Sequence, residues 1–237
     1  MNTDNNDLTK QRRLLMQGIG ILENFGVIDF NGHFSVRLDD ERILINSGAS
    51  IRSALTHEDF VVVDLNGHSD SSQPAPPAEL PLHLAIYRAR PDVKTVVHGH
   101  PKWSTLLTGA GKRYEVMLAQ GALLGQVSVF QSPRSVNNEQ VASDVAATLG
   151  EGNAALLKAH GSVIAATDVL EATVMAIYLE LNAERQVLSA PLGGGYVFTP
   201  AETEACRKGL AKRGLYEKCW NYYLAKYGLV SDKPNNA

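Results

Sequence analysis

Cysteine is scarce in this chain of 237 residues, which contains only Cys206 and Cys219. Two cysteines in a polar, helix-like stretch support neither a disulfide framework nor a cysteine-based zinc site. An excess of basic residues is also lacking, because 22 Lys and Arg stand against 25 Asp and Glu, for a net charge of -3. No basic stripe is available to neutralise a phosphate backbone. Nucleic acid is therefore not an expected partner.

Long apolar runs are missing as well. No segment approaches the roughly 18 uninterrupted apolar residues of a transmembrane helix. Residues 1–7 are polar and acidic, unlike a signal peptide, so we expect a cytoplasmic protein with no membrane partner. The length permits one hydrophobic core. We expect 1–237 to form a single domain, with its core over about 8–190 and a helical C-terminal segment over about 200–228.

Hydrophobic periodicity and turn residues predict alternating helices and strands. The expected helices span residues 8–25, 79–90, a short piece from 101, 138–149, 168 to about 187, and 202–227. The expected strands span residues 33–38, 42–46, 60–64, 93–98, 115–118, 127–130, 154–157 and 162–166. These strands outnumber the crossovers that a purely parallel sheet requires. The pattern therefore predicts an α/β fold with a mixed, largely antiparallel sheet and helices on its faces.

The most informative fragment is Val97-His98-Gly99-His100-Pro101, at the end of a predicted strand. Residues two apart on a strand project from the same face, so both imidazoles are expected to point one way and chelate a cation. His160, followed by Gly161 between two apolar runs, offers a third imidazole. Three protein ligands with an open position are typical of a catalytic metal site. Glu79, at the start of a predicted helix, is the fourth candidate ligand and a candidate acid or base.

Each of these features has a plainer interpretation. A His-X-His on a strand is more often a partly exposed pair, a glutamate at a helix start is usually a favourable charge, and a His-Gly is usually a turn. Among the other histidines, His57 fits a helix-starting Thr-x-x-Asp segment and His68 lies in a turn. His83, one turn into the helix that follows Glu79, is expected to be structural.

Taken in order, several segments resemble the class II aldolase/adducin family. The resemblance covers about residues 14–187. Its elements are Asn31-Gly32-His33-Phe34-Ser35-Val36-Arg37, Ile45-Asn46-Ser47-Gly48, Glu79-Leu80-Pro81-Leu82-His83, Arg90-Pro91-Asp92-Val93, Val97-His98-Gly99-His100-Pro101 and Lys158-Ala159-His160-Gly161.

The resemblance implies a three-layer α/β/α sandwich and one divalent metal ion per subunit, held by His98, His100 and His160 with Glu79 as the acidic catalytic residue. Three imidazoles suit Zn²⁺, while the carboxylate also permits Mn²⁺, Co²⁺ or Fe²⁺. It also implies a homo-oligomer, usually a tetramer, with active sites at subunit interfaces. A tyrosine from the neighbouring subunit often completes such sites, and the candidates for that position here are Trp220, Tyr222 and Tyr223.

Departures from the sugar-phosphate members bear on the substrate. The resemblance places substrate-binding positions at Gly32, His33, Ser47 and Gly48. Just before Glu79, where those members carry two serines, this chain has Pro77 and Ala78. Both hydroxyls are lost and Pro77 has no N–H, so hydrogen-bond donors for a phosphate dianion are depleted. We therefore expect a small-molecule carboxylate or hydroxy-carbonyl substrate in place of a phosphosugar.

Three functions remain open. The first is a decarboxylase similar to those acting on hydroxy-aromatic dicarboxylates, with Glu79 protonating the carbon that loses CO₂. The second is a class II aldolase or 4-epimerase acting on a sugar or sugar-phosphate-like compound. The third is a non-catalytic assembly domain like the adducin head, which is disfavoured because Glu79 and the three histidines are all present.

Overall fold

The computed structural model of the protein describes residues 2–229. Seven α-helices are present in this range: α1 (Asn2–Phe25), α2 (Leu80–Ala89), α3 (Lys102–Gly109), α4 (Glu139–Leu149), α5 (Val169–Ser189), α6 (Pro200–Leu210) and α7 (Arg213–Lys226). The strands are β1 (His33–Arg37), β2 (Arg42–Asn46), β3 (Phe60–Asp64), β4 (Thr95–Gly99), β5 (Ser128–Phe130), β6 (Ala154–Leu157) and β7 (Gly161–Ala166). Short 3₁₀ helices span Arg52–Ala54, His57–Asp59, Ala119–Leu124 and Ala190–Leu192.

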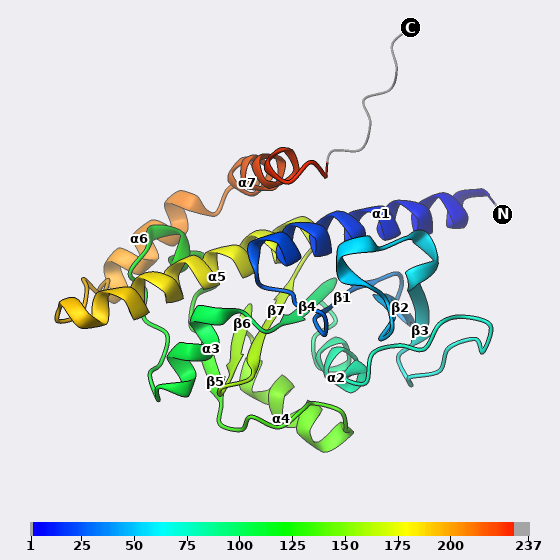
Figure 1. The fold of residues 1–237 in the computed structure, drawn as a ribbon, viewed down its shortest axis with the longest axis horizontal. Coiled ribbons are helices and arrows are strands. Elements are labelled where there is room, and N and C mark those ends of the chain that lie inside the picture. Colours follow the sequence, from blue (N-terminus) through cyan, green and yellow to red (C-terminus); the bar gives the residue numbers. More distant parts are fainter. Residues whose placement is uncertain (1, 230–237) are drawn as a thin grey trace, which may run out of the picture.

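The strands form one sheet in the order β3-β2-β1-β4-β7-β6-β5. Neighbouring strands are antiparallel except for β5 and β6, which are parallel. Helices α1 and α5 cover one face, and α2 and α4 lie on the other (Figure 1). The predicted α/β class, the three layers and the mixed, largely antiparallel sheet are thus confirmed.

Alternating side chains of the strands pack into two hydrophobic cores, one on each face of the sheet. On β2, Leu44 packs into the core beneath α1 and α5, whereas Ile43 and Ile45 pack against α2. On β6, Leu156 joins the first core and Leu157 the second. This period of two is the strand pattern that the sequence shows. Burial on both faces makes the sheet a rigid support for the groups at its strand ends.

Two predicted elements are wrong. Residues 115–118 form no strand, because their backbone is bonded by side chains of α5: Asn182 Oδ1 accepts the N–H groups of Met117 and Leu118 at 2.9 Å each. The segment 202–227 is two helices, separated by non-helical backbone at Ala211 and Lys212. Gly209 and Gly214 weaken helix propensity around this break.

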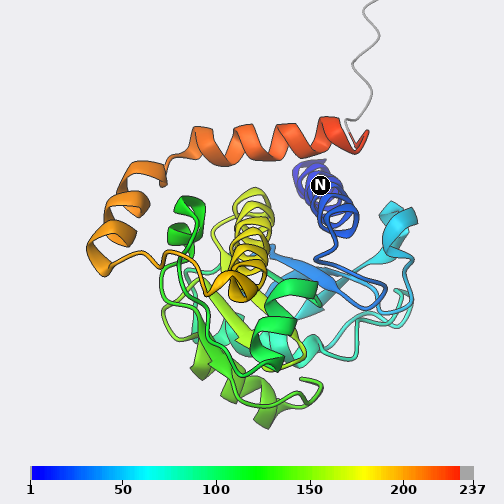
Figure 2. The ribbon, with the colours of Figure 1, turned by 60° about the vertical axis from the view of Figure 1, so that its left-hand side comes forward.

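Helix α7 returns across the outside of the helical layer after that break. Tyr216, Trp220 and Leu224 are buried there, and α7 lies across α1 (Figure 2). None of the helices in residues 2–229 is long and apolar enough to cross a lipid bilayer.

Candidate active site

Strand β4 carries the first two candidate ligands out of the centre of the sheet. His98 pairs in register with His33 on β1 and with Val163 on β7, so its side chain is fully buried. Its Nδ1 lies 3.0 Å from the carbonyl oxygen of Ser162. A carbonyl only accepts, so Nδ1 carries the proton and Nε2 keeps a lone pair. That buried Nε2 has no hydrogen-bond partner among the described residues.

Asp29 orients His100, which follows β4. His100 Nδ1 lies 2.9 Å from Asp29 Oδ1, and the same oxygen accepts the N–H groups of Asn31 and Gly32. Burial raises the pKa of Asp29, but the hydrogen bonds from His100 and the two amides outweigh burial and hold this pKa below its usual value. The ionised carboxylate accepts the Nδ1 proton and leaves Nε2 of His100 as the ligand atom.

His160 arrives from the tight turn between β6 and β7. Ala159, just before it, adopts a left-handed φ of 53°. A side chain at Gly161 would place its Cβ 2.4 Å from the carbonyl oxygen of Gly99, so only glycine lets this turn approach β4. The turn brings His160 and His100 together, with ring centroids 5.3 Å apart.

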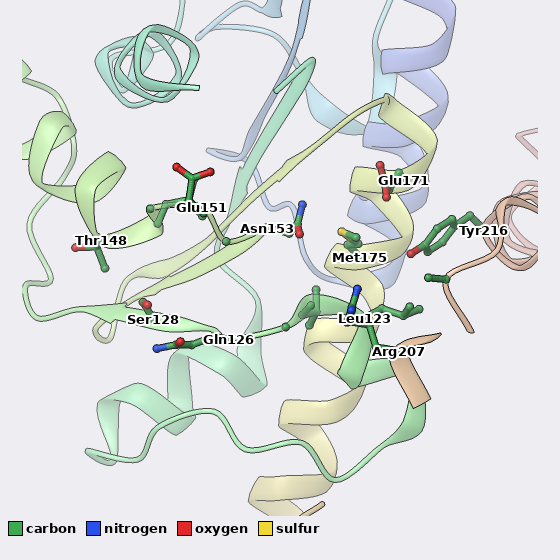
Figure 3. Close-up of a pocket in the computed structure, with 16 residues that line it drawn as sticks. Leu123, Gln126, Ser128, Thr148, Glu151, Asn153, Glu171, Met175, Arg207 and Tyr216 are labelled. Carbon is green, nitrogen blue, oxygen red and sulfur yellow. The ribbon is translucent and has the colours of Figure 1, made fainter. Parts of the chain in front are cut away.

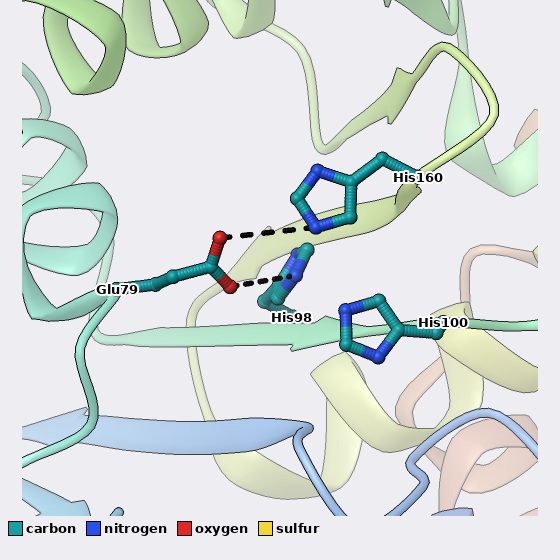
Figure 4. Close-up of side chains that lie close together, drawn as sticks. All are labelled: Glu79, His98, His100 and His160. Atoms are coloured by element: carbon teal, nitrogen blue, oxygen red, sulfur yellow. Dashed lines mark ion pairs between the residues drawn. The ribbon is translucent and has the colours of Figure 1, made fainter. Parts of the chain in front are cut away.

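Glu79 faces these rings from the N-cap position of α2. Its Oε1 accepts the Ser135 hydroxyl at 2.8 Å and the Val136 N–H at 2.7 Å. Its Oε2 lies 3.3 Å from His98 Nε2, and Oε1 lies 3.8 Å from His160 Nε2 (Figure 4). The loop before α4 therefore fixes one carboxylate oxygen, while the other turns toward the histidines.

Hydrogen bonds keep Glu79 ionised despite its burial. Burial raises the pKa of this carboxyl, but hydrogen bonds from His33 and the Val136 amide outweigh burial and hold it well below its ordinary value. Burial also lowers the pKa of His98 to about 4, and it lowers the pKa of His160. The cluster thus combines the neutral imidazoles of His98 and His160 with a carboxylate, the protonation states that a divalent cation requires of its ligands.

These four side chains fit a single metal ion. One ligand atom from each of Glu79, His98, His100 and His160 lies within 4.8 Å of the others. The unpartnered Nε2 of His98 inside a polar cluster is independent support, because a buried nitrogen without a hydrogen bond is costly unless a ligand occupies it. Nitrogen and oxygen donors of this kind suit Zn²⁺ and also permit Mn²⁺, Co²⁺ or Fe²⁺.

The cluster opens into a cavity of about 480 Å³. Of the four predicted substrate-binding residues, His33 and Gly48 line it. Gly32 and Ser47 are not among its lining residues, but their carbonyl oxygens accept hydrogen bonds from Arg52, which lines it. Pro77 and Ala78 form part of the wall. The remaining lining residues are Asn31, Arg52, Glu79, His100, Ser135 and His160.

Comparison with known proteins agrees with this arrangement. The sequence profile of the family described as class II aldolase and adducin N-terminal domain matches residues 19–187. The chain belongs to the class II aldolase and adducin family.

Two relatives from this family show the range of its chemistry. A 3,4-dihydroxyphthalate decarboxylase from Terrabacter sp. is 29% identical over 232 residues, which cover 92% of this chain and 97% of the relative. An L-fuculose phosphate aldolase from Methanococcus maripaludis is also 29% identical, over 158 residues that cover 67% of this chain and 85% of the relative. One relative is named a decarboxylase and the other an aldolase, at the same percentage identity.

A solved structure confirms the class II aldolase fold. The L-fuculose 1-phosphate aldolase from Glaciozyma antarctica superimposes with a TM-score of 0.83 at 20% sequence identity. The superposition covers 98% of this chain and 96% of the other.

Three residues around the site were not predicted from the sequence. Asp29 orients His100, Ser135 binds Glu79, and Arg52 lines the cavity. Asp29 and Ser135 lie in loops without hydrophobic periodicity. The available signal for Arg52 was a lone cation among small and apolar residues after Ser47-Gly48.

The two candidate inter-subunit tyrosines lie away from this cavity. Tyr222 is 58% exposed on α7, and the Tyr223 ring packs edge-on against Phe25. Neither lines the cavity of its own chain. Their contribution to a neighbouring subunit stays a prediction.

A larger cavity of about 640 Å³ lies elsewhere, beside β5, α5 and the end of α4 (Figure 3). Its labelled polar side chains include Gln126, Thr148, Glu151 and Arg207. The described residues that line it include no histidine and none of the four clustered side chains.

Proposed function

We propose that the protein is a metal-dependent carbon–carbon lyase that decarboxylates a hydroxy-aromatic carboxylate, or another hydroxy- or keto-carboxylate. The observation that carries this proposal is the composition of the 480 Å³ cavity. One wall holds the carboxylate and imidazoles of the candidate metal centre, and Arg52 supplies a buried cation to the same cavity. Such a cavity is suited to a small anionic substrate.

Arg52 is a buried charge that makes no direct ion pair within residues 2–229. The residue is only 5% exposed. Its Nε donates to the carbonyl of Gly32 at 2.6 Å, and its Nη1 donates to the carbonyls of Ser47 and Ser50 and to the Ser50 hydroxyl. Asp29 and Asp59 attract this charge from a distance, but burial outweighs them and lowers the pKa of Arg52. Because a buried charge without a direct partner is costly, an anionic group on the substrate would stabilise this arrangement.

Two further residues that line the cavity favour a carboxylate over a phosphate. Pro77 has no N–H and Ala78 has no hydroxyl, although both line the cavity. A phosphate dianion needs several donors around three oxygens, whereas a carboxylate is satisfied by two parallel bonds from one guanidinium. This supports the decarboxylase over an enzyme for phosphosugars.

Glu79 is positioned to move the proton that the reaction requires. A bound divalent cation would supply positive charge next to the carbon–carbon bond that breaks. Glu79, ionised in this structure, can accept the proton of a substrate hydroxyl and then deliver it to the carbon that loses CO₂. That carbon keeps the electron pair of the broken bond, and the substrate oxygen regains a proton from water. One proton is consumed for each CO₂ released.

We further propose that the protein works in the cytoplasm as a homo-oligomer with Zn²⁺ or Mn²⁺ as its metal. The donor set supports these ions but also fits Co²⁺ and Fe²⁺. Solvent-exposed Tyr222 is available to reach a second subunit. Metal analysis of the purified protein, with its mass in solution, tests both statements.

The decisive experiment offers substrates to metal-loaded protein and measures CO₂. A panel of hydroxy-aromatic dicarboxylates, including dihydroxyphthalates, is incubated with protein reconstituted with Zn²⁺ or Mn²⁺. We expect CO₂ release that chelation abolishes, and Glu79→Gln protein serves as the matched control. Absence of CO₂ from every carboxylate in the panel would contradict the decarboxylase.

An aldolase or epimerase acting on a hydroxy-carbonyl compound is the second candidate. The same metal cluster serves it, and the 29% identity to an aldolase favours it equally. Aldehyde release without CO₂ from a sugar or sugar-phosphate panel would establish it. Failure to bind any divalent metal would revive an adducin-like assembly role, which the intact Glu79 and histidine set argues against.

A further inference from the structure

A chain of buried hydrogen bonds runs from the protein interior to Glu79. Tyr87 Oη lies 2.8 Å from Ser35 Oγ, and Ser35 Oγ lies 2.6 Å from His83 Nδ1. His83 Nε2 lies 2.7 Å from His33 Nδ1. His33 Nε2 then lies 3.4 Å from Glu79 Oε2. Each of these four contacts thus joins two polar atoms at hydrogen-bond distance.

The chain is built by two facing elements with different periodicities. His33 and Ser35 are two apart on β1 and therefore share one face of the sheet. His83 and Tyr87 are four apart on α2 and share one face of the helix. Where α2 packs on the sheet, side chains from β1 and from α2 therefore alternate along one row.

The two histidines of this chain are buried and contact each other. His33 is 1% exposed and His83 is fully buried. The 2.7 Å contact between His33 Nδ1 and His83 Nε2 requires one of these nitrogens to donate and the other to accept. A neutral imidazole has one N–H donor and one acceptor nitrogen. In each ring, a partner that fixes one nitrogen as the donor therefore makes the other nitrogen the acceptor.

The two ends of the chain set that direction. Glu79 Oε1 already accepts from Ser135 and Val136, and its ionised Oε2 accepts from His33 Nε2–H. His33 Nδ1 must then accept from His83 Nε2–H, and His83 Nδ1 must accept from the Ser35 hydroxyl. At the far end, burial raises the pKa of Tyr87, so its hydroxyl stays protonated and donates to Ser35.

We propose that His83 is a positioning residue for Glu79: its Nε2–H holds His33 in the tautomer whose Nε2–H points at the Glu79 carboxylate. The other tautomer of His33 would turn a lone pair toward that carboxylate and repel it. Loss of the His83 donor would therefore disturb the orientation of Glu79 without removing any group that contacts the substrate. The inference rests on the proposed catalytic role of Glu79, although the tautomer itself does not.

The tautomer can be measured without any substrate. Nitrogen-15 NMR of the histidine rings distinguishes protonated from unprotonated nitrogens in the Zn²⁺-loaded full-length protein, with the His33 signals assigned by their loss in His33→Asn. We expect His33 and His83 both to carry the proton on Nε2. A proton on His33 Nδ1 would overturn the proposal even if the protein proves to be a decarboxylase.

Variants of His83 supply the functional readout. In His83→Gln the side-chain amide can still donate to His33 Nδ1, whereas His83→Leu removes the donor while keeping an apolar side chain. We expect kcat to fall by about 10- to 100-fold in His83→Leu, the usual effect of losing a partner that orients an active-site group, with KM nearly unchanged. His83→Gln should recover most of the loss.

Graded effects along the chain separate positioning from simple packing. Ser35→Ala leaves His83 Nδ1 without its donor and should lower kcat less than His83→Leu, while Tyr87→Phe, one bond further away, should lower it least. Thermal midpoints measured in parallel show whether stability follows the same order. Equal kcat values for His83→Leu and His83→Gln would overturn the proposal, as would losses that simply follow thermal stability. Absent decarboxylation would instead contradict the proposed function and leave the NMR result to decide the tautomer.

Discussion

The candidate active-site cavity and the larger cavity beside β5 differ in a way that volume does not reveal. The larger, about 640 Å³, is bordered by exposed polar groups such as Gln126 and Glu151. The smaller, about 480 Å³, is bordered by groups that the fold keeps away from water, including His33 and Arg52. Burying such groups costs free energy, and a fold retains them where they bind or react.

The two cavities also differ in the hydrogen bonds that hold their lining side chains in place. Around the smaller cavity, Asp29 fixes His100 and the loop at Ser135 and Val136 fixes Glu79. No comparable network of buried ionisable side chains joins the described residues of the larger wall. Buried and oriented polar atoms, and not volume, therefore distinguish the candidate active site from the larger cavity.

The largest expected effect follows removal of a candidate metal ligand. His98→Ala and His160→Ala should lose metal and lyase activity together, because each deletes an imidazole donor from the cluster. Metal content by elemental analysis and CO₂ release are the measurements. Gln126→Ala in the larger cavity is the matched control, and full metal occupancy in His98→Ala would refute the assigned ligand set.

Glu79→Gln should separate metal binding from proton transfer. The amide keeps an oxygen in the cluster but cannot carry the proton, so we expect metal to remain while kcat drops by about two to four orders of magnitude. Single-turnover CO₂ release measures the step. An unaffected kcat would remove Glu79 from the chemistry and weaken the contrast between the cavities.

Arg52→Lys tests whether the buried cation binds the substrate. Lysine keeps the charge but loses the planar pair of donors. Hydrogen bonds to charged groups contribute roughly 1.5–3 kcal/mol, so we expect KM for a carboxylate substrate to rise by about 10- to 100-fold. Initial-rate kinetics give KM, and thermal unfolding controls for damage to the loop at Gly32 and Ser47. A KM equal to wild type at intact stability would assign Arg52 to loop support alone.

Buried histidines should make the metal-free protein sensitive to mild acid. Unfolded histidine binds a proton near pH 6.5, whereas folded His98 does so only at a pKa of about 4, and the pKa of His83 is also depressed. Between these values the unfolded state binds more protons, so stability falls as pH falls. We expect the thermal midpoint to drop by about 5–10 °C from pH 7.5 to 5.5.

Circular dichroism of the chelator-treated protein measures how the thermal midpoint changes with pH. His68→Gln, a substitution at an exposed position, should leave it unchanged. A thermal midpoint that stays constant over this range would contradict the neutral, buried state assigned to His83 and His98.

The smallest effect is expected at the larger cavity. Gln126→Ala removes a polar side chain from its wall but touches none of the clustered ligands, so kcat/KM should stay within about twofold of wild type, as surface substitutions usually do. Steady-state CO₂ release is the measurement. A large loss here would show that the bigger cavity takes part in the reaction.

Much of the fold could be predicted because its signals are local. The apolar run of β2 marks it as a strand, Asp168 caps α5 by accepting the Glu171 N–H at the start of the predicted helix, and Pro91 follows the end of α2. The errors at 115–118 and at 202–227 have a different origin. At 115–118, the side chain of Asn182 on the distant helix α5 accepts a backbone N–H that a strand would use. At 202–227, the break lets α7 turn back and bury Trp220.

For the site, the sequence by itself determined the kinds of donor, because His98, Gly99 and His100 at a strand end carry a local geometric signal. Only the tertiary structure decided that His160 and Glu79 approach the same point, and that Asp29, Arg52 and His83 surround it. Loops without periodicity and contacts between distant segments leave no spacing rule in the sequence. Their positions follow from the packing of α2 and the two turns against the sheet.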